Sequence, residues 1–344
     1  MADLTTSFAG LSLKNPVIAG SCELTMDEAG IAACVAAGAG AVVAKSINES
    51  PAAAEQLDRA DYVLLDAAWR EVPWRSGRAD ATLFNRSGLA QTDLAGWCAM
   101  LGRSQRVAAE SGSMVIGSIT VGAAAAAAEI ARALGEVVPA IELNVGAPHG
   151  RESSAISQMT DSEAVAECVR GVRAAVECPL IVKLPGQAGD VIGLARAAAA
   201  AGADAVTLIG RFNGFMPDLE TWDPVLGSWG AIGGGWSLPL SLYWVSKCHR
   251  ELAGTPLIGT NGARDGGDVV RFLLSGARAV ELVSLLFALG PGAISTVLEE
   301  LDACLSGQGV ENLSEIIGVS AARARRYSEI PPIGNPKPWA EVGR

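Results

Sequence analysis

The feature that most restricts the fold of this chain is a regular alternation of short apolar runs with longer alanine-rich stretches. The runs have the length of single strands and contain Val and Ile throughout, as parallel strands buried on both faces do. They occupy residues 15–20, 41–46, 114–120, 139–145, 180–184, 204–209, 256–260 and 279–284. Predicted helices follow them at 26–37, 91–111, 123–135, 161–177, 189–201, 238–253, 265–275 and 290–306. Eight strand–helix units predict a (β/α)8 TIM barrel, with a doubly wound open sheet as the alternative.

Local signals mark the ends of several predicted helices. Thr160 followed by Glu163 fits a capping box, and Gly202, Gly254 and Gly276 fit helix C-termini. We predict that the barrel spans residues 1–310, and that residues 311–344 form a C-terminal helix and a tail packed on it.

Composition limits the classes of function. Half of the 344 residues are apolar and 18% are charged, which predicts a deep core. The net charge of −11 disfavours nucleic acid and anionic membranes as partners. The 7 cysteines are scattered without a CxxC pair, which indicates free thiols in a reducing compartment and no metal site. Without a recognisable signal peptide or membrane span, a cytoplasmic protein is expected.

Two long connections interrupt the regular pattern. Residues 47–84 contain Trp69 and Trp74, and residues 210–237 contain three further tryptophans and several glycines. Both follow a strand, on the C-terminal face where active sites of barrels form. We interpret them as a lid or a wall of the active site, and the alternative is a pair of peripheral hairpins.

Polar side chains lie where the predicted strands end. Lys45, Asn144 and Lys183 each follow an apolar run. The loops after the seventh and eighth strands contain Gly259-Thr260-Asn261-Gly262 and Val283-Ser284. Small residues there let backbone N–H groups approach a phosphate, and barrels often bind phosphate at this position.

An ordered series of motifs resembles the dihydroorotate dehydrogenase family from about Leu4 to Gly307. The resemblance is to the cytosolic class and to the FMN domain of dihydropyrimidine dehydrogenases. The matching elements are Leu13-Lys14-Asn15-Pro16-Val17-Ile18-Ala19-Gly20-Ser21, Lys45-Ser46, Asn85-Arg86-Ser87-Gly88-Leu89, Glu142-Leu143-Asn144, Val182-Lys183, Gly202-Ala203-Asp204-Ala205-Val206-Thr207, Gly233-Gly234-Gly235-Trp236-Ser237, Pro256-Leu257-Ile258-Gly259 and Ser275-Gly276-Ala277.

The resemblance implies FMN as the cofactor and assigns residues to it. The expected flavin contacts are Ala19, Gly20, Lys45, Ser46, Asn144, Lys183, Gly234, Gly235, Asn261, Gly262, Val283 and Ser284. A fixed ammonium such as that of Lys183 would stabilise the negative charge of a reduced flavin. The alternative role for Lys183 is a buried ion pair with Glu142. Asn85 and Asn144 would bind a planar, amide-like substrate, because an asparagine presents both donors and an acceptor.

Three positions depart from the family pattern. Ala147 stands where the family has its catalytic Cys or Ser, His149 replaces an asparagine, and Gly210-Arg211 replaces an Asn-Ser or Asn-Thr pair. We expect His149 to act as the acid or base in place of that Cys or Ser, with the alternative of a solvated bystander. Ser153 and Ser154 are weaker candidates. Arg211 could bind a substrate carboxylate, or be a solvated charge at the rim.

We therefore predict an FMN-dependent oxidoreductase of the dihydroorotate dehydrogenase type with an altered substrate pocket. Hydride would pass between the flavin and a CH–CH bond of a small planar substrate. Two alternatives are a flavin-free lyase or aldolase with a Schiff base on Lys183, and a non-catalytic FMN-binding barrel. The electron acceptor is unknown, and a homodimer is possible.

Overall fold

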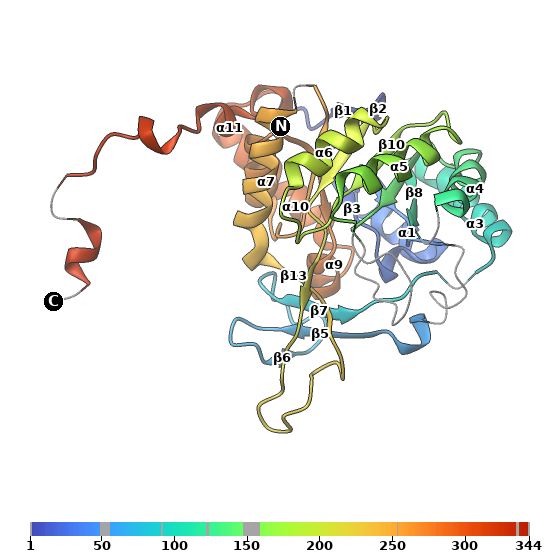
Figure 1. Ribbon diagram of the computed structural model, residues 1–344, viewed down its shortest axis with the longest axis horizontal. Coiled ribbons are helices and arrows are strands. Elements are labelled where there is room, and N and C mark those ends of the chain that lie inside the picture. Colours follow the sequence, from blue (N-terminus) through green and yellow to red (C-terminus); the bar gives the residue numbers. More distant parts are fainter. Residues whose placement is uncertain are drawn as a thin grey trace.

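The computed structural model describes residues 2–48, 56–90, 92–121, 124–146, 159–252, 254–334 and 337–342. Eight parallel strands close into a barrel in sequence order, and helices surround it (Figure 1). The strands are β3 (Val17–Ala19), β4 (Ala41–Val43), β8 (Met114–Thr120), β9 (Ala140–Asn144), β10 (Leu180–Lys183), β11 (Ala205–Leu208), β14 (Leu257–Thr260) and β15 (Ala277–Leu282). The predicted TIM barrel is confirmed and the open sheet is excluded, because β15 pairs with β3.

The predicted helices are present, with shifted ends. They are α1 (Glu28–Ala36), α3 (Leu94–Glu110), α4 (Ala124–Gly135), α5 (Ser162–Arg173), α6 (Val191–Ala200), α7 (Leu238–Glu251), α8 (Gly266–Ser275) and α10 (Ala293–Gly307). A short helix that was not predicted, α9 (Ser284–Leu289), precedes α10. The capping box expected at Thr160 is wrong, because Asp161 is the N-cap of α5 and accepts a hydrogen bond from the backbone of Ala164.

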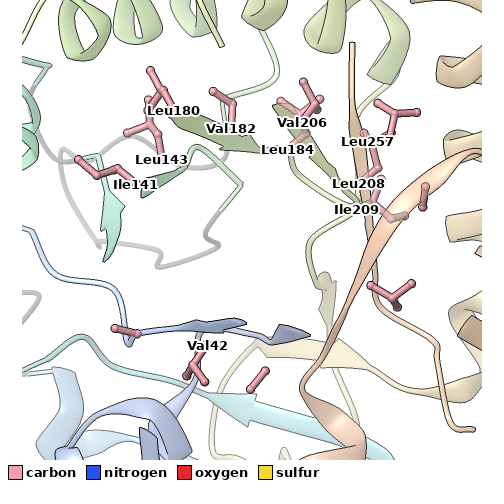
Figure 2. Packing of buried hydrophobic residues seen from close by; sticks show 14 of the residues in the cluster. Val42, Ile141, Leu143, Leu180, Val182, Leu184, Val206, Leu208, Ile209 and Leu257 are labelled. Carbon is pink, nitrogen blue, oxygen red and sulfur yellow. The ribbon is translucent and has the colours of Figure 1, made fainter. Parts of the chain in front are cut away.

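The two faces of each barrel strand meet different surroundings, since successive side chains of a strand point to opposite sides. On β10, Leu180 and Val182 pack outward in the large core beneath the helices, whereas Ile181 belongs to a separate cluster inside the barrel. Figure 2 shows Val182, Val206 and Leu257 on the side of the strands that faces the helices. The apolar runs of the sequence therefore supply two cores, one outside and one inside the barrel.

A hairpin that was not predicted closes the N-terminal end of the barrel. Its strands are β1 (Thr6–Phe8) and β2 (Leu11–Leu13), paired antiparallel. Phe8, Leu11 and Leu13 are buried in the inner cluster with Ile116 and Ile258. Burial of these side chains among the described residues excludes water from this end of the barrel.

The two long connections form one antiparallel sheet over the C-terminal end of the barrel (Figure 1). Its strands, in spatial order, are β12 (Phe212–Gly214), β13 (Gly230–Gly233), β7 (Thr82–Arg86), β5 (Asp61–Leu65) and β6 (Glu71–Val72). Tyr62 of this sheet stacks on Phe287 of α9, with ring centroids 5.5 Å apart. The connections are thus hairpins, as one alternative held, and they also contribute a wall to the cavity described below.

The C-terminal segment begins with a helix that packs on the barrel. The short helix α11 (Val319–Arg323) contacts α7 and α8. Residues 322–334 are exposed and extend away from the barrel in Figure 1. The predicted domain boundary at residue 310 stays a prediction.

Candidate active site

A large cavity opens at the C-terminal ends of the barrel strands, among the residues that the structure describes. It encloses about 900 Å³, including space open to solvent. The strand-end residues, the antiparallel sheet and α9 all contribute to its wall. The lining consists of Ser21, Cys22, Glu23, Lys45, Ser46, Tyr62, Leu83, Asn144, Gly146, Lys183, Ile209, Gly210, Arg211, Gly233, Thr260, Asn261, Gly262, Ala263, Glu281, Leu282, Val283, Ser284 and Phe287.

The floor of this cavity is a row of buried polar residues just above the apolar row inside the barrel. On β10 the inward position after Ile181 is Lys183, and on β9 the inward position after Ala140 is Glu142. Glu281 takes the corresponding place on β15. Each of these polar side chains is at least nine-tenths buried, so each requires a partner inside the protein.

Lys183 obtains two such partners. Its Nζ donates to Glu142 Oε2 at 3.4 Å and forms a closer ion pair with Glu281. Burial lowers the pKa of Lys183, but Glu142 and Glu281 outweigh burial, and the pKa is raised overall. Burial and then the negative charge of Glu281 raise the pKa of Glu142 to about 8, although Lys183 opposes this shift. Lys183 therefore carries a charge at neutral pH, and Glu142 is mostly a neutral acid.

Lys45 lies on another side of the cavity in a pair with Glu23. Burial lowers the pKa of Lys45, and Glu23 opposes the change. Burial works against ionisation of Glu23, but Lys45, Tyr62 and Arg211 together lower its pKa. The charge of Lys45 is thus compensated within the site, as is that of Lys183.

Arg211 is held by neutral groups of the antiparallel sheet. Its guanidinium donates to Asn85 Oδ1, and to Ser87 Oγ at 3.0 Å. Asn85 is fully buried, and its Nδ2 has no hydrogen-bond partner within the described ranges. Arg211 lines the cavity, so Asn85 lies behind it and positions its charge. Arg211 is therefore held in the cavity wall by hydrogen bonds, and its role in substrate binding stays a prediction.

The loops after β14 and β15 bring backbone close to the cavity. Gly262 has a φ of +124°, and a Cβ there would lie 2.6 Å from the backbone nitrogen of Leu238 at the start of α7. A Cβ on Gly20 would lie 2.7 Å from Val283. Neither position has room for a larger residue, so backbone rather than side chains forms this part of the wall.

The sequence-predicted site residues fall into three groups. Most line the cavity, namely Lys45, Ser46, Asn144, Lys183, Arg211, Asn261, Gly262, Val283 and Ser284. Asn85, Gly20, Gly234 and Gly235 lie next to lining residues, whereas the Ala19 side chain packs in the outer core. His149, Ala147, Ser153 and Ser154 lie outside the described residues.

Sequence reasoning missed Glu23, Tyr62 and Glu281. A glutamate among the apolar residues of the segment 279–282 was the one signal that could have revealed Glu281. Glu23 and Tyr62 lie in segments without a strand or helix pattern before the fold is known. These residues reach the site only because distant segments converge on it.

Two searches of the described residues gave negative results. No group of three or more His, Cys, Asp or Glu residues there is arranged to hold a metal ion. In the same part of the chain, no helix has both the length and the apolar character needed to cross a bilayer.

Comparisons with known proteins agree with this architecture. A family model described as dihydroorotate dehydrogenase matches residues 3–305. The catalytic subunit of dihydroorotate dehydrogenase B (NAD(+)) from Desulforudis audaxviator is 30% identical over 91% of this chain and 96% of its own length. The protein of the same name from Thermoplasma acidophilum is 26% identical over 93% and 99%. That from Geobacter sp. (strain M21) is 35% identical, over 53% of this chain and 59% of its own length.

Proposed function

The chain belongs to the dihydroorotate dehydrogenase family and is an oxidoreductase of that type, and from this premise we propose that it uses FMN. In this proposal, hydride passes between the flavin and a CH–CH bond of a small planar substrate, such as a dihydropyrimidine or a related cyclic amide. The observation that carries the proposal is the convergence of Lys45, Asn144, Lys183 and Asn261 on one cavity at the C-terminal end of the barrel.

The cavity fits a flavin phosphate and ring. Gly262 lines the cavity, and its tight packing against Leu238 leaves no room for a side chain at that position. The buried polar row offers charge and hydrogen bonds to a planar ring above it. When bound, FMN supplies the hydride acceptor or donor. Lys45, Ser46, Lys183 and the loops at Asn261 and Ser284 would hold it.

The residues of the chain then have separate tasks. Lys183 places a positive charge near the ring, although its ion pair with Glu281 cancels part of that charge. Asn144 and Arg211 orient the substrate. The raised pKa of Lys183 disfavours the lyase alternative, since a Schiff base requires a neutral amine. A non-catalytic FMN-binding barrel stays the second candidate, because Ala147 provides no proton-transfer group.

The substrate pocket differs from one built for dihydroorotate. Asn85 uses its carbonyl oxygen on Arg211, so this asparagine does not present both of its groups to a substrate. A substrate amide edge that is left unpaired on burial costs about 1–3 kcal/mol. We therefore expect weak activity on dihydroorotate, because a carboxylate bound by Arg211 does not replace the missing amide contacts.

One experiment tests both parts of this proposal. The purified protein, as isolated and after addition of FMN, is examined for flavin absorbance and for bound flavin. A protein that stays colourless and binds no FMN contradicts the cofactor. The flavin-loaded protein is then mixed anaerobically with dihydroorotate. The flavin should stay mostly oxidised, and rapid bleaching at micromolar dihydroorotate would instead restore the usual family activity.

We further propose that His149 transfers the proton on the substrate side. Once a substrate is known, kcat/KM should rise through an apparent pKa of about 6–7. His149→Ala should abolish this rise of kcat/KM with pH and lower the rate by about 10²-fold. An unchanged pH profile in His149→Ala would assign the proton to another group, with Ser153, Ser154 and Arg211 as the next candidates.

The electron acceptor is proposed to be a partner subunit. The support is that the relatives are named catalytic subunits, a name that suggests further subunits. We also propose that the protein is located in the cytoplasm and that two copies of this chain form a homodimer. Copurification from the native host, followed by measurement of the mass of the complex, tests it. An isolated chain that turns over with a soluble acceptor as fast as the native preparation would count against a partner.

A further inference from the structure

A continuous line of hydrogen-bonded side chains runs from the cavity wall to Glu142 in the cavity floor. Ser21 Oγ and Ser46 Oγ lie 3.2 Å apart, and Ser46 Oγ and Ser118 Oγ lie 2.8 Å apart. Ser118 Oγ donates to Glu142 Oε1 at 3.3 Å. The residues come from β8, β9 and the loops after β3 and β4, so only the closed barrel brings them together.

The two ends of this line have different surroundings. Ser21 and Ser46 line the cavity, whereas Ser118 and Glu142 are 0% and 1% exposed. Each serine hydroxyl can donate one hydrogen bond while it accepts another. Protons can therefore shift along the serines, each hydroxyl giving one and receiving one, without leaving a net charge on any of them. The carboxyl group at the buried end can either hold or release a proton.

We propose that Glu142, Ser118, Ser46 and Ser21 form a buried proton relay that exchanges one proton between Glu142 and the flavin bound in the cavity. This inference rests on the proposed function, because it requires a flavin above Ser46. It adds a role for the chain's own residues on the flavin side, apart from the role of His149 on the substrate side.

The exchange balances when electrons reach or leave the flavin singly, because hydride from the substrate brings its own hydrogen and needs no relay. Two electrons and one proton convert the oxidised flavin ring into its reduced anion. Once the Ser118 hydroxyl turns from Glu142 toward Ser46, Glu142 gives its proton to Ser118 Oγ and the hydroxyl proton of Ser118 passes to Ser46. The hydroxyl proton of Ser46 then passes to Ser21, and that of Ser21 passes to the ring. Glu142 becomes a carboxylate. When the electrons leave one at a time to an acceptor, the proton returns by the same steps.

The groups that face Glu142 favour this role. Glu281 on β15, Lys183 on β10 and Ser118 on β8 surround it. Burial and Glu281 raise its pKa to about 8, so Glu142 holds a transferable proton at neutral pH. Lys183 touches the same carboxyl group, but its pKa is raised and it retains its proton. The serines are therefore the better route to the cavity.

Infrared spectroscopy can observe Glu142 directly. In the protein without FMN, the C=O band of a protonated carboxyl group should titrate near pH 8 and be absent in Glu142→Gln. In the FMN-loaded protein, flash photoreduction with a sacrificial electron donor should bleach this band as the flavin is reduced. The band should then recover as Glu142 takes a proton from water.

Variants of one hydroxyl test the route. Ser118→Ala should slow the bleach by at least about tenfold, equal to about 1.4 kcal/mol in the barrier, and Ser118→Thr, which keeps a hydroxyl, should restore it. Thr207→Val is the matched control, since Thr207 Oγ1 is buried and has no partner in the described part of the chain.

A band that does not respond to flavin reduction in the wild type overturns the relay, and so does a Ser118→Ala protein that bleaches at the wild-type rate. Failure of the relay can be told apart from failure of the proposed function. A protein that binds FMN but shows no bleach refutes the relay alone, whereas a protein that binds no FMN refutes both.

Discussion

Two neighbouring rows of side chains inside the same barrel have opposite chemistry. The lower row contains Ile116, Ile181 and Ile258, closed from below by the hairpin β1–β2. The upper row, one inward position further along the strands, contains Ser118, Lys183 and Thr260. On β8 and β10, the apolar residues Ile116 and Ile181 are only two positions from the polar residues Ser118 and Lys183. The same backbone can thus stabilise the fold at one level and present chemistry at the next.

The comparison also shows what each row requires. Apolar side chains stabilise the barrel through burial alone. Each buried polar side chain needs a specific partner, and the partners come from other strands, as Glu142 and Glu281 do for Lys183. The lower row should therefore respond to changes in volume, and the upper row to changes in charge. The following predictions test this distinction.

The largest effect is expected from Lys183→Met in the protein without FMN. The change leaves Glu142 and Glu281 buried without a cation, which should lower the free energy of unfolding by about 3–5 kcal/mol at neutral pH. Urea denaturation measures this loss. Because the loss comes from negative charge buried without its cation, it should shrink as the pH falls. A loss that is independent of pH would show that Lys183 acts by packing.

A similar or somewhat smaller loss is expected from Ile181→Ala, in the row below. Ile181 is 1% exposed, and truncation of a buried isoleucine costs about 2–5 kcal/mol. No charge changes, so the loss should be the same at each pH in the same urea experiment. A loss that varies with pH as in Lys183→Met would mean that the two rows are not independent.

A moderate effect is expected from pH itself, through Glu142. Its pKa is raised in the folded protein from 4.5 to about 8, so the folded state binds the proton more tightly than the unfolded chain does. The stabilisation is complete below the unfolded pKa and is lost as the pH rises through the folded pKa. The slope should be on the order of 1 kcal/mol per pH unit in this window, and Glu142→Gln should flatten it. Equal slopes in both proteins would contradict the assignment to Glu142.

The smallest effect is expected from Thr207→Val in the upper row. Thr207 is fully buried, and its hydroxyl has no partner within the described residues. Loss of an unsatisfied hydroxyl at nearly constant volume should change the free energy of unfolding by less than about 1 kcal/mol. A larger loss would reveal a hydrogen bond that forms in solution, and would make Thr207 a member of the polar network.

The barrel itself could be predicted because its signal is local. Each run such as 180–184 has strand length and apolar composition, and the structure places β10 at Leu180–Lys183. The exact start of a helix is harder to predict. The start of α5 depends on a hydrogen bond from the backbone N–H of Ala164 to the side chain of Asp161. The hairpin β1–β2 was not predicted, since its strands are only three residues long. The two long connections were predicted as hairpins only in one alternative, and their joining into one sheet was not predicted, because β13 pairs with the distant β7.

The sequence by itself determined the eight-strand alternation, the polar residues at the strand ends and the resemblance to a family. It also allowed the ion pair of Lys183 with Glu142, because their strands are neighbours. Only the tertiary structure decided that Glu281, from the other side of the barrel, shares this lysine, and that Asn85 faces Arg211. The physical reason is that strand identity follows from local composition. The partner of a buried charge follows from closure of the barrel, which joins residues nearly 100 positions apart.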